Sequence, residues 1–273
     1  MSTTALKMDQ QLQNRARILV KCPDKPGIVS VLSSFLHAHN ANIIESNQYS
    51  SDPEDGMFFI RIEFHCDDLV MKRSKMEDEF KQIAAQHNMT YSFHYKAIRQ
   101  RAAIYVSKET HCLMELLWEW QNGDLDMDIA VVISNSDVAR PMVEALGIPY
   151  YYIPANKDIR EQVEAEQIRL MEEFNVDLLI LARYMQILTP NFVAHFENRI
   201  INIHHSFLPA FVGANPYARA FARGVKLIGA TSHYVTNDLD EGPIIEQDVE
   251  RVDHRDDVAA LKKIKMLPGA LVA

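Results

Sequence analysis

The sequence predicts an α/β protein in two parts, a βαββαβ unit over residues 1–97 and a strand–helix alternation over residues 98–273. Two changes in the hydrophobic pattern support this division. Up to residue 97, strands of alternating polarity are interleaved with two amphipathic helices. After the charged connector at 96–101, short and almost wholly apolar strands alternate with helices, as in a buried parallel sheet with helices on both faces.

The first part is expected to contain strand 16–22, helix 24–40, strands 41–51 and 57–66, helix 76–87 and strand 90–97. Strand 57–66 alternates apolar and charged residues, which indicates one buried face. Asp24 is a candidate N-cap for the first helix, and Pro26 is tolerated in a first turn. This order predicts a ferredoxin-like layer, with the helices packed on an antiparallel sheet.

The second part is expected to contain strands 102–106, 128–134, 148–154, 176–182, 199–203, 225–235 and 242–252, with helices near 113–120, 157–174 and 190–196. Such alternation predicts a doubly wound, Rossmann-like sheet. The last two strands follow one another without a helix between them, so we expect the sheet to become antiparallel at one edge.

Composition limits the function. The net charge of −9 disfavours nucleic acid and anionic membranes as partners. The sequence has no apolar run of the roughly 20 residues that cross a bilayer, and its first residues lack a signal-peptide core. Its three separated cysteines form no disulfide framework. We therefore expect a cytoplasmic protein, and this composition is compatible with a small-molecule enzyme, a regulator or a scaffold.

The segment "INIHHSF" places polar residues at the end of a predicted strand. Side chains alternate along a strand, so Asn202 and His204 share one face and His205 points the other way. Ligands of open parallel sheets bind beyond the carboxyl ends of the strands. A metal site is the alternative explanation for adjacent histidines, but they point apart and no carboxylate lies at ligand spacing. We therefore expect no bound metal.

A second polar segment, "SHYVTNDLDEGPIIEQ", places Asp240 just before a Gly-Pro turn. Taken alone, "DLDE" is typical of a solvated acidic loop. If Asp240 meets Asn202 and His204, the site contains an amide donor, an imidazole and a carboxylate. That set suits attack on a carbonyl, because the donors stabilise an oxyanion while the carboxylate orients or deprotonates the nucleophile.

These two segments resemble the folate-dependent formyltransferase family, whose signature is Asn-x-His followed by Asp-x-Gly-Pro. The resemblance implies that Asn202, His204 and Asp240 are catalytic. "LARYMQIL" (181–188) is similar to the folate-pocket segment of that family. The implied substrate-binding residues are Leu181, Arg183, Met185, Gln186, Leu188 and Gly242.

The turn "DKPGI" resembles the ACT domain, a small amino-acid-sensing module. That resemblance implies a regulatory or oligomerisation domain over 1–97, with effector contacts from Asp24, Pro26, Gly27 and Ile28. Glycine or methionine is the expected effector, and a homo-oligomer (dimer or tetramer) the expected assembly. The alternative is that Gly27 only allows the chain to turn.

An ACT-like domain joined to a formyltransferase-like catalytic domain over 98–273 resembles the deformylase branch of the family. Its members hydrolyse 10-formyltetrahydrofolate to tetrahydrofolate and formate, which supplies formate for purine synthesis and balances the one-carbon folate pool. They use no prosthetic group. Segment 102–117 contains no glycine to cradle a nucleotide phosphate, so water is the expected acceptor. Transfer to an amine and a non-catalytic folate or amino-acid sensor are the alternatives.

The end of the chain departs from the family pattern. A helical pattern that begins near residue 256 breaks after Ile264 into "KMLPGALVA". We expect the C-terminal end to be truncated or altered after about 264, which puts the stability of the second domain in question.

Overall fold

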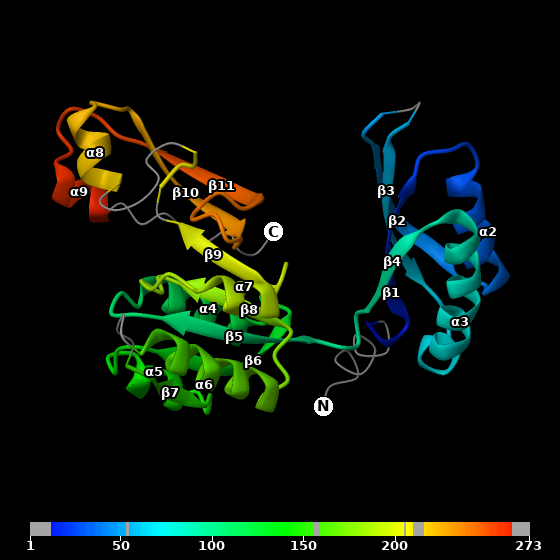
Figure 1. Cartoon of the computed structure of the whole chain (residues 1–273), viewed down its shortest axis with the longest axis horizontal. Helices are drawn as coiled ribbons and strands as arrows, with labels where there is room; N and C mark the ends of the chain where they lie inside the picture. Colours follow the sequence, from blue (N-terminus) through cyan, green and yellow to red (C-terminus); the bar gives the residue numbers. More distant parts are fainter. Residues whose placement is uncertain (1–11, 53–54, 155–158, 205, 210–215, 264–273) are drawn as a thin grey trace. The chain divides into compact units, whose positions relative to one another are not determined.

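The computed structural model describes residues 12–52, 55–154, 159–204, 206–209 and 216–263. His205 and the unusual segment after Lys263 therefore lie outside the described residues. The chain divides into two compact units, Met1–Arg99 and Gln100–Ala273 (Figure 1). Within the described ranges, no helix is long and apolar enough to cross a membrane.

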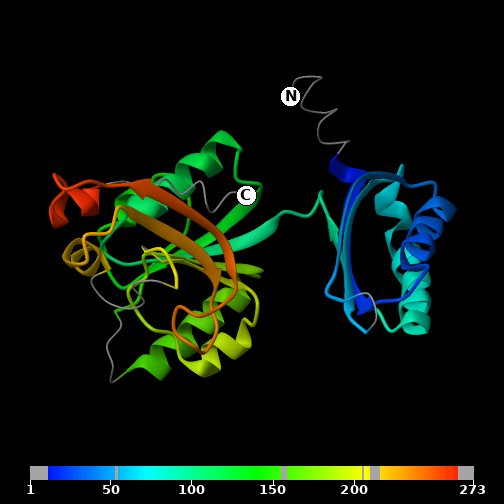
Figure 2. The same ribbon diagram turned by 90° about the horizontal axis from the view of Figure 1, so that it is seen from above.

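The first unit has the predicted βαββαβ order. Its elements are β1 (Arg15–Pro23), α2 (Ile28–Ala38), β2 (Asn42–Ser50), β3 (Met57–His65), α3 (Leu69–His87) and β4 (Thr90–Tyr95). The strands form an antiparallel sheet in the order β2-β3-β1-β4. Both helices lie against the same face of this sheet (Figure 2).

The core of the first unit lies between that sheet face and the helices. Ile18 of β1 is 2% exposed, and Leu32 of α2 and Phe80 of α3 pack in the same cluster. Burying a side chain of this size stabilises the fold by about 1.5–3 kcal/mol. The alternation seen in strand 57–66 follows from this arrangement, because only one face of β3 meets the helices.

The start of α2 differs from the expectation. The helix begins at Ile28, Gly27 occupies the N-cap with φ 94°, and no side chain caps it. Asp24 was the predicted cap, and that prediction is wrong, because Asp24 accepts a hydrogen bond from Ser50 Oγ instead. A φ in the left-handed region interrupts the helical path, so the helix cannot extend back to residue 24.

The second unit contains a seven-stranded sheet in the order β11-β10-β9-β8-β5-β6-β7. Its strands are β5 (Gln100–Val106), β6 (Met127–Ser134), β7 (Tyr150–Tyr152), β8 (Leu178–Ala182), β9 (Ile200–His204), β10 (Leu227–Tyr234) and β11 (Ile244–Arg251). Parallel pairing joins the neighbouring strands β9, β8, β5, β6 and β7. Strand β10 pairs antiparallel with both β9 and β11. The predicted change of direction at one edge is therefore confirmed.

Helices cover both faces of the parallel part. The helices of this unit are α4 (His111–Asn122), α5 (Arg140–Glu144), α6 (Arg160–Glu173), α7 (Pro190–His195), α8 (Pro216–Ala222) and α9 (Val258–Lys263). Ile104 packs in the cluster that contains α4, and the next residue, Tyr105, packs in the cluster that contains α6 and α7. The edge strand β11 is exposed at every position except Gln247, which is half-buried.

Candidate active site

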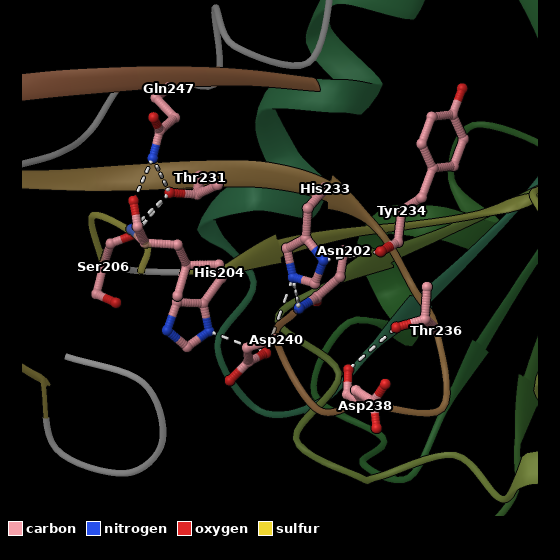
Figure 3. A network of polar contacts seen from close by, with 11 residues as sticks. Asn202, His204, Ser206, Thr231, His233, Tyr234, Thr236, Asp238, Asp240 and Gln247 are labelled. Atoms are coloured by element: carbon pink, nitrogen blue, oxygen red, sulfur yellow. Dashed lines mark hydrogen bonds and ion pairs between the residues drawn. The ribbon is translucent and has the colours of Figure 1, made fainter. Parts of the chain in front are cut away.

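The three predicted catalytic side chains converge at the carboxyl end of β9 (Figure 3). Asn202 and His204 lie on this strand two residues apart, and β10 places His233 opposite Asn202 and Thr231 opposite His204. Both polar side chains therefore point to the same side of the sheet, as the strand alternation predicted.

Asp240 reaches this site from the loop between β10 and β11. Its Oδ1 lies 3.3 Å from Nδ1 of His204, and each of the two side chains is only 8% exposed. This contact turns the Nδ1 edge of the imidazole toward the carboxylate and fixes the orientation of the ring.

His233 is a site residue that the sequence reasoning missed. It is 2% exposed, and its Nε2 lies 3.2 Å from Nδ2 of Asn202 and 3.8 Å from Oδ1 of Asp240. The signal was present in "SHY", a histidine in a predicted strand. Recognising it requires the register of β10 against β9, which the sequence pattern does not contain.

The hydrogen bonds of His233 fix the orientation of Asn202. Nδ1 of His233 lies 2.9 Å from the Tyr234 carbonyl oxygen, so Nδ1 donates and Nε2 is left to accept from the Asn202 amide. Burial lowers the pKa of His233 below its ordinary value; Tyr234 and Asp240 oppose this shift and His204 adds to it. A neutral ring at pH 7 keeps Nε2 an acceptor.

The loop that carries Asp240 is tightly fixed. Tyr234 N donates to the Pro243 carbonyl at 2.9 Å, which closes the loop at its base. A Cβ at Gly242 would lie 1.8 Å from the Tyr234 carbonyl oxygen, so only glycine allows this approach. Asp240 itself has φ 58°, a left-handed conformation that is uncommon outside glycine, asparagine and aspartate.

A buried polar network holds the chain that follows β9. Thr231 Oγ1 donates to the Ser206 carbonyl at 2.9 Å and accepts from Leu208 N at 3.1 Å. Gln247 Nε2 of β11 also contacts Thr231 Oγ1, at 3.0 Å, and donates to the Leu208 carbonyl at 2.9 Å. These contacts join β10 and β11 to the segment beyond His204, which restricts that side of the site.

The predicted folate segment follows β8. Leu181 is 5% exposed and packs in the core, so its side chain supports the segment from within. Met185 is 57% exposed, and Gln186 and Leu188 are half-buried. Met185 N donates to Ser107 Oγ at 3.0 Å, which ties this segment to the end of β5.

A buried carboxylate on α6 fixes the far end of the same segment. Glu164 is 5% exposed and accepts from Thr189 N at 2.8 Å and from Thr189 Oγ1. Thr189 caps α7, because its Oγ1 accepts from Phe192 N. Gln167, one turn along α6, donates to the Tyr184 hydroxyl at 3.0 Å. Residues 183–189 are thus held at both ends.

The four predicted effector residues lie in the first unit, at the β1–α2 turn. Pro26 and Gly27 are exposed, Asp24 is half-buried, and Ile28 is 2% exposed and belongs to the core. The structure therefore leaves the turn itself accessible but not the Ile28 side chain. Among the described residues, no group of three or more His, Cys, Asp and Glu side chains is arranged to hold a metal ion.

The fold and the site together define a formyltransferase-type domain joined to an ACT domain. The profile described as formyl transferase matches residues 100–266, and the ACT domain profile matches residues 16–70. The chain is 63% identical over 252 residues to the formyltetrahydrofolate deformylase of Bacillus subtilis. These residues make up 92% of this chain and 84% of that relative. The chain belongs to the formyltetrahydrofolate deformylase family.

Solved structures agree with this assignment. A formyltetrahydrofolate deformylase from Pseudomonas syringae matches with a TM-score of 0.87 and 46% identity, covering 91% of this chain and 84% of that chain. A glycinamide ribonucleotide transformylase from Symbiobacterium toebii matches with a TM-score of 0.56 and 31% identity, covering 60% of this chain and 79% of that chain. The likeness to the deformylase therefore extends over more of the chain.

Proposed function

We propose that this protein hydrolyses 10-formyltetrahydrofolate to tetrahydrofolate and formate. The observation that carries the proposal is the convergence of Asn202, His204 and Asp240, with His204 and Asp240 in contact at 3.3 Å. The 63% identical relative from Bacillus subtilis is named for the same activity. An amide donor, an imidazole and a carboxylate around one point are the groups that attack on a formyl carbon requires.

Asn202 and His204 are the proposed oxyanion donors. The Asn202 amide gives one N–H to His233 and directs its second N–H to the formyl oxygen. His204 is the second donor to the same oxygen, and its contact with Asp240 at 3.3 Å holds the ring in place. Loss of one such donor slows turnover by about 10²–10³-fold in enzymes of this type.

Asp240 is the proposed proton carrier. It holds the attacking water and takes one of its protons as the oxygen bonds to the formyl carbon. The bond between that carbon and N10 then breaks, and Asp240 gives N10 the proton that it took from the water. The second water proton is released to solvent, so the formyl group leaves as formate. Asp240, His204 and water handle every proton in this scheme, which therefore needs no prosthetic group.

Water is favoured over an amine acceptor by the segment between β5 and α4. Residues 107–110 contain no glycine, and α4 begins at His111 with Thr110 at its N-cap. A nucleotide phosphate bound at this helix would meet side chains instead of bare backbone amides. The hydrolytic reaction has no such requirement, because its acceptor is water.

The proposed folate contacts are Arg183, Met185, Gln186, Leu188 and Gly242, with Met185, Gln186 and Leu188 beside the pterin. Leu181 supports this segment from the core. Glycine or methionine is the proposed ligand of the first unit, at Asp24, Pro26 and Gly27; calorimetric titration that detects no heat with either amino acid would refute this. We also propose a homo-oligomer and a cytoplasmic location. The three cysteines are free and buried, which suits a reducing compartment.

Formate release from 10-formyltetrahydrofolate by the purified protein, without added amine, tests the proposed activity. Asp240→Asn should lower kcat by about 10²–10⁴-fold. Asp238→Asn is the matched control, because it makes the same change in the same loop at an exposed position. Folate binding without formate would favour a sensor. Formyl transfer that begins only when an amine is added would favour a transferase, and an active Asp240→Asn variant would refute the role of Asp240.

A further inference from the structure

The sheet of the first unit has one face that its helices do not cover, because both helices lie against the other face (Figure 2). Apolar side chains on this open face come from three neighbouring strands. Leu19 of β1 is 39% exposed, Phe59 of β3 is 38% exposed and Tyr49 of β2 is 66% exposed. Tyr49 pairs with Phe59 across the strands, and their ring centroids lie 6.4 Å apart. Exposed apolar side chains gathered on one face mark an interaction surface.

The open face has the size and shape that a second sheet requires. A hollow of about 510 Å³ lies among its side chains and is lined by all four strands. Two sheets that pack face to face interdigitate their side chains at a separation of about 10 Å, so the side chains of a second sheet would fill such a hollow. Strands spaced about 4.8 Å apart, rising about 3.3 Å per residue, give this face roughly 500 Å². Two such faces together bury roughly 1,000 Å², about the lower limit for a specific interface.

The charged side chains of the open face divide it into two unlike halves. One row of paired residues crosses the sheet in the order Glu45, Glu63, Arg17 and His94, from β2 through β3 and β1 to β4. The carboxylates therefore lie on the β2–β3 half, and the basic side chains of this row lie on the β1–β4 half. In the next row but one, Lys21 of β1 lies 5.6 Å from the centre of the Phe59 ring of β3.

We propose that two copies of this chain pack the open faces of their first units together about a twofold axis that runs along the strands, between β1 and β3. This axis lays β1 of one copy over β3 of its partner and β4 over β2. Arg17 then faces the partner's Glu63, and His94 faces the partner's Glu45. Lys21 faces the partner's Phe59 ring, which attracts a cation. A twofold interface must be self-complementary, and the division of the face into two halves meets that requirement.

The charge pattern also selects this axis over the other twofold axis that lies in the plane of the interface. An axis across the strands would place Lys21 over the partner's Arg17, and like charges in contact oppose association. Two further cations near Glu63, Arg15 and Lys96, lie at the end of the sheet. Their side chains are about one-third exposed, so solvent and salt screen their repulsion between copies.

Sedimentation velocity over a dilution series tests the interface, because an interface of this size should dissociate on dilution. Leu19→Lys should raise the dissociation constant about 30-fold or more, since the new charge faces the partner's Arg61 at the centre of the interface. Leu19→Glu should raise it less, because a carboxylate at that position meets the same guanidinium. Val70→Lys is the matched control, since Val70 is exposed on α3 in the helix layer, and it should leave the constant unchanged.

Cross-linking tests the direction of the axis. Asn47 and Ser92 lie in one row at opposite edges of the sheet, and the proposed axis lays Ser92 over the partner's Asn47. Facing sheets are about 10 Å apart, too far for a disulfide, so the reagent is a short bismaleimide. A mixture of the Asn47→Cys and Ser92→Cys proteins should form a covalent dimer, and neither variant should do so alone. The three native cysteines are buried and should not react.

Two results would overturn the interface. One is an unchanged dissociation constant in Leu19→Lys, including the case in which this variant melts at a lower temperature with its assembly intact, because the face would then be covered within one chain. The other is a covalent dimer of Asn47→Cys alone, which would indicate the other axis or pairing through the β2 edge. A wild type that is monomeric at every concentration would refute the proposed homo-oligomer as well. The interface does not depend on the proposed hydrolysis, which formate release tests separately.

Discussion

Gly242→Ala is expected to disable the site without touching any of the proposed catalytic groups. An added Cβ would lie 1.8 Å from the Tyr234 carbonyl oxygen, whereas real Cβ atoms essentially never approach closer than 3.0 Å. The loop must therefore move by about 1.2 Å. Asp240 is two residues away, and its 3.3 Å contact with His204 would lengthen beyond hydrogen-bond range. A misplacement of about 1 Å costs roughly 10²-fold in rate.

Formate release by purified Gly242→Ala should therefore show kcat lowered by about 10²-fold, with the protein still folded. Gly224→Ala is the control, because this glycine has φ 64° and a Cβ added there would meet no atom within 4 Å. That variant should lose about 1–2 kcal/mol of stability through its backbone conformation alone and keep its kcat. Wild-type turnover by Gly242→Ala would refute the view that the closed loop positions Asp240.

Three further predictions concern buried polar groups. Burial lowers the folded pKa of His233 below 6.5. Its contribution to stability is therefore present above about pH 6.5 and is lost as the pH falls through the folded pKa. In urea unfolding above and below that range, the free energy of unfolding should fall less in His233→Gln than in the wild type. Glu164→Gln should raise KM for the folate several-fold with little change in kcat, because Thr189 loses a charged acceptor, while the exposed Glu166→Gln should not. The Glu63 side chain is 8% exposed and faces Arg17 at 3.3 Å and Lys96 at 3.7 Å. Glu63→Gln should therefore lower the free energy of unfolding by about 1 kcal/mol in low salt. The loss should be smaller in high salt, because salt screens the ion pairs.

Strand alternation was sufficient to place Asn202 and His204 on one side of the sheet, because that period of two is a local property of the chain. The change to antiparallel pairing at one edge was also readable, since the predicted strands 225–235 and 242–252 have no helix between them. Asp240 entered the site through its Gly-Pro turn and the family resemblance. Its contact with His204 depends on the path of the loop between β10 and β11, which the sequence pattern does not show.

The remaining features depend on long-range geometry or on backbone angles. His233 acts through its register opposite Asn202, and antiparallel register is set by the whole sheet. Asp24 does not cap α2 because Gly27 adopts a left-handed φ. A glycine in the sequence does not by itself indicate that conformation. Arg183 has a positive φ, which is uncommon for arginine and cannot be predicted from its residue type. The short helices α5 and α8 were missed because five and seven residues carry too little periodicity.

The exposed strand β11 also affects the solubility of the protein. An edge strand presents unpaired backbone groups to which another sheet can add. On β11, Glu246, Asp248 and Glu250 repeat at alternate positions and are largely exposed. A second copy aligned along this edge would bring like charges together, which opposes continuous sheet growth. Charge-neutral replacements here are therefore expected to favour fibrous aggregates, whatever their effect on turnover.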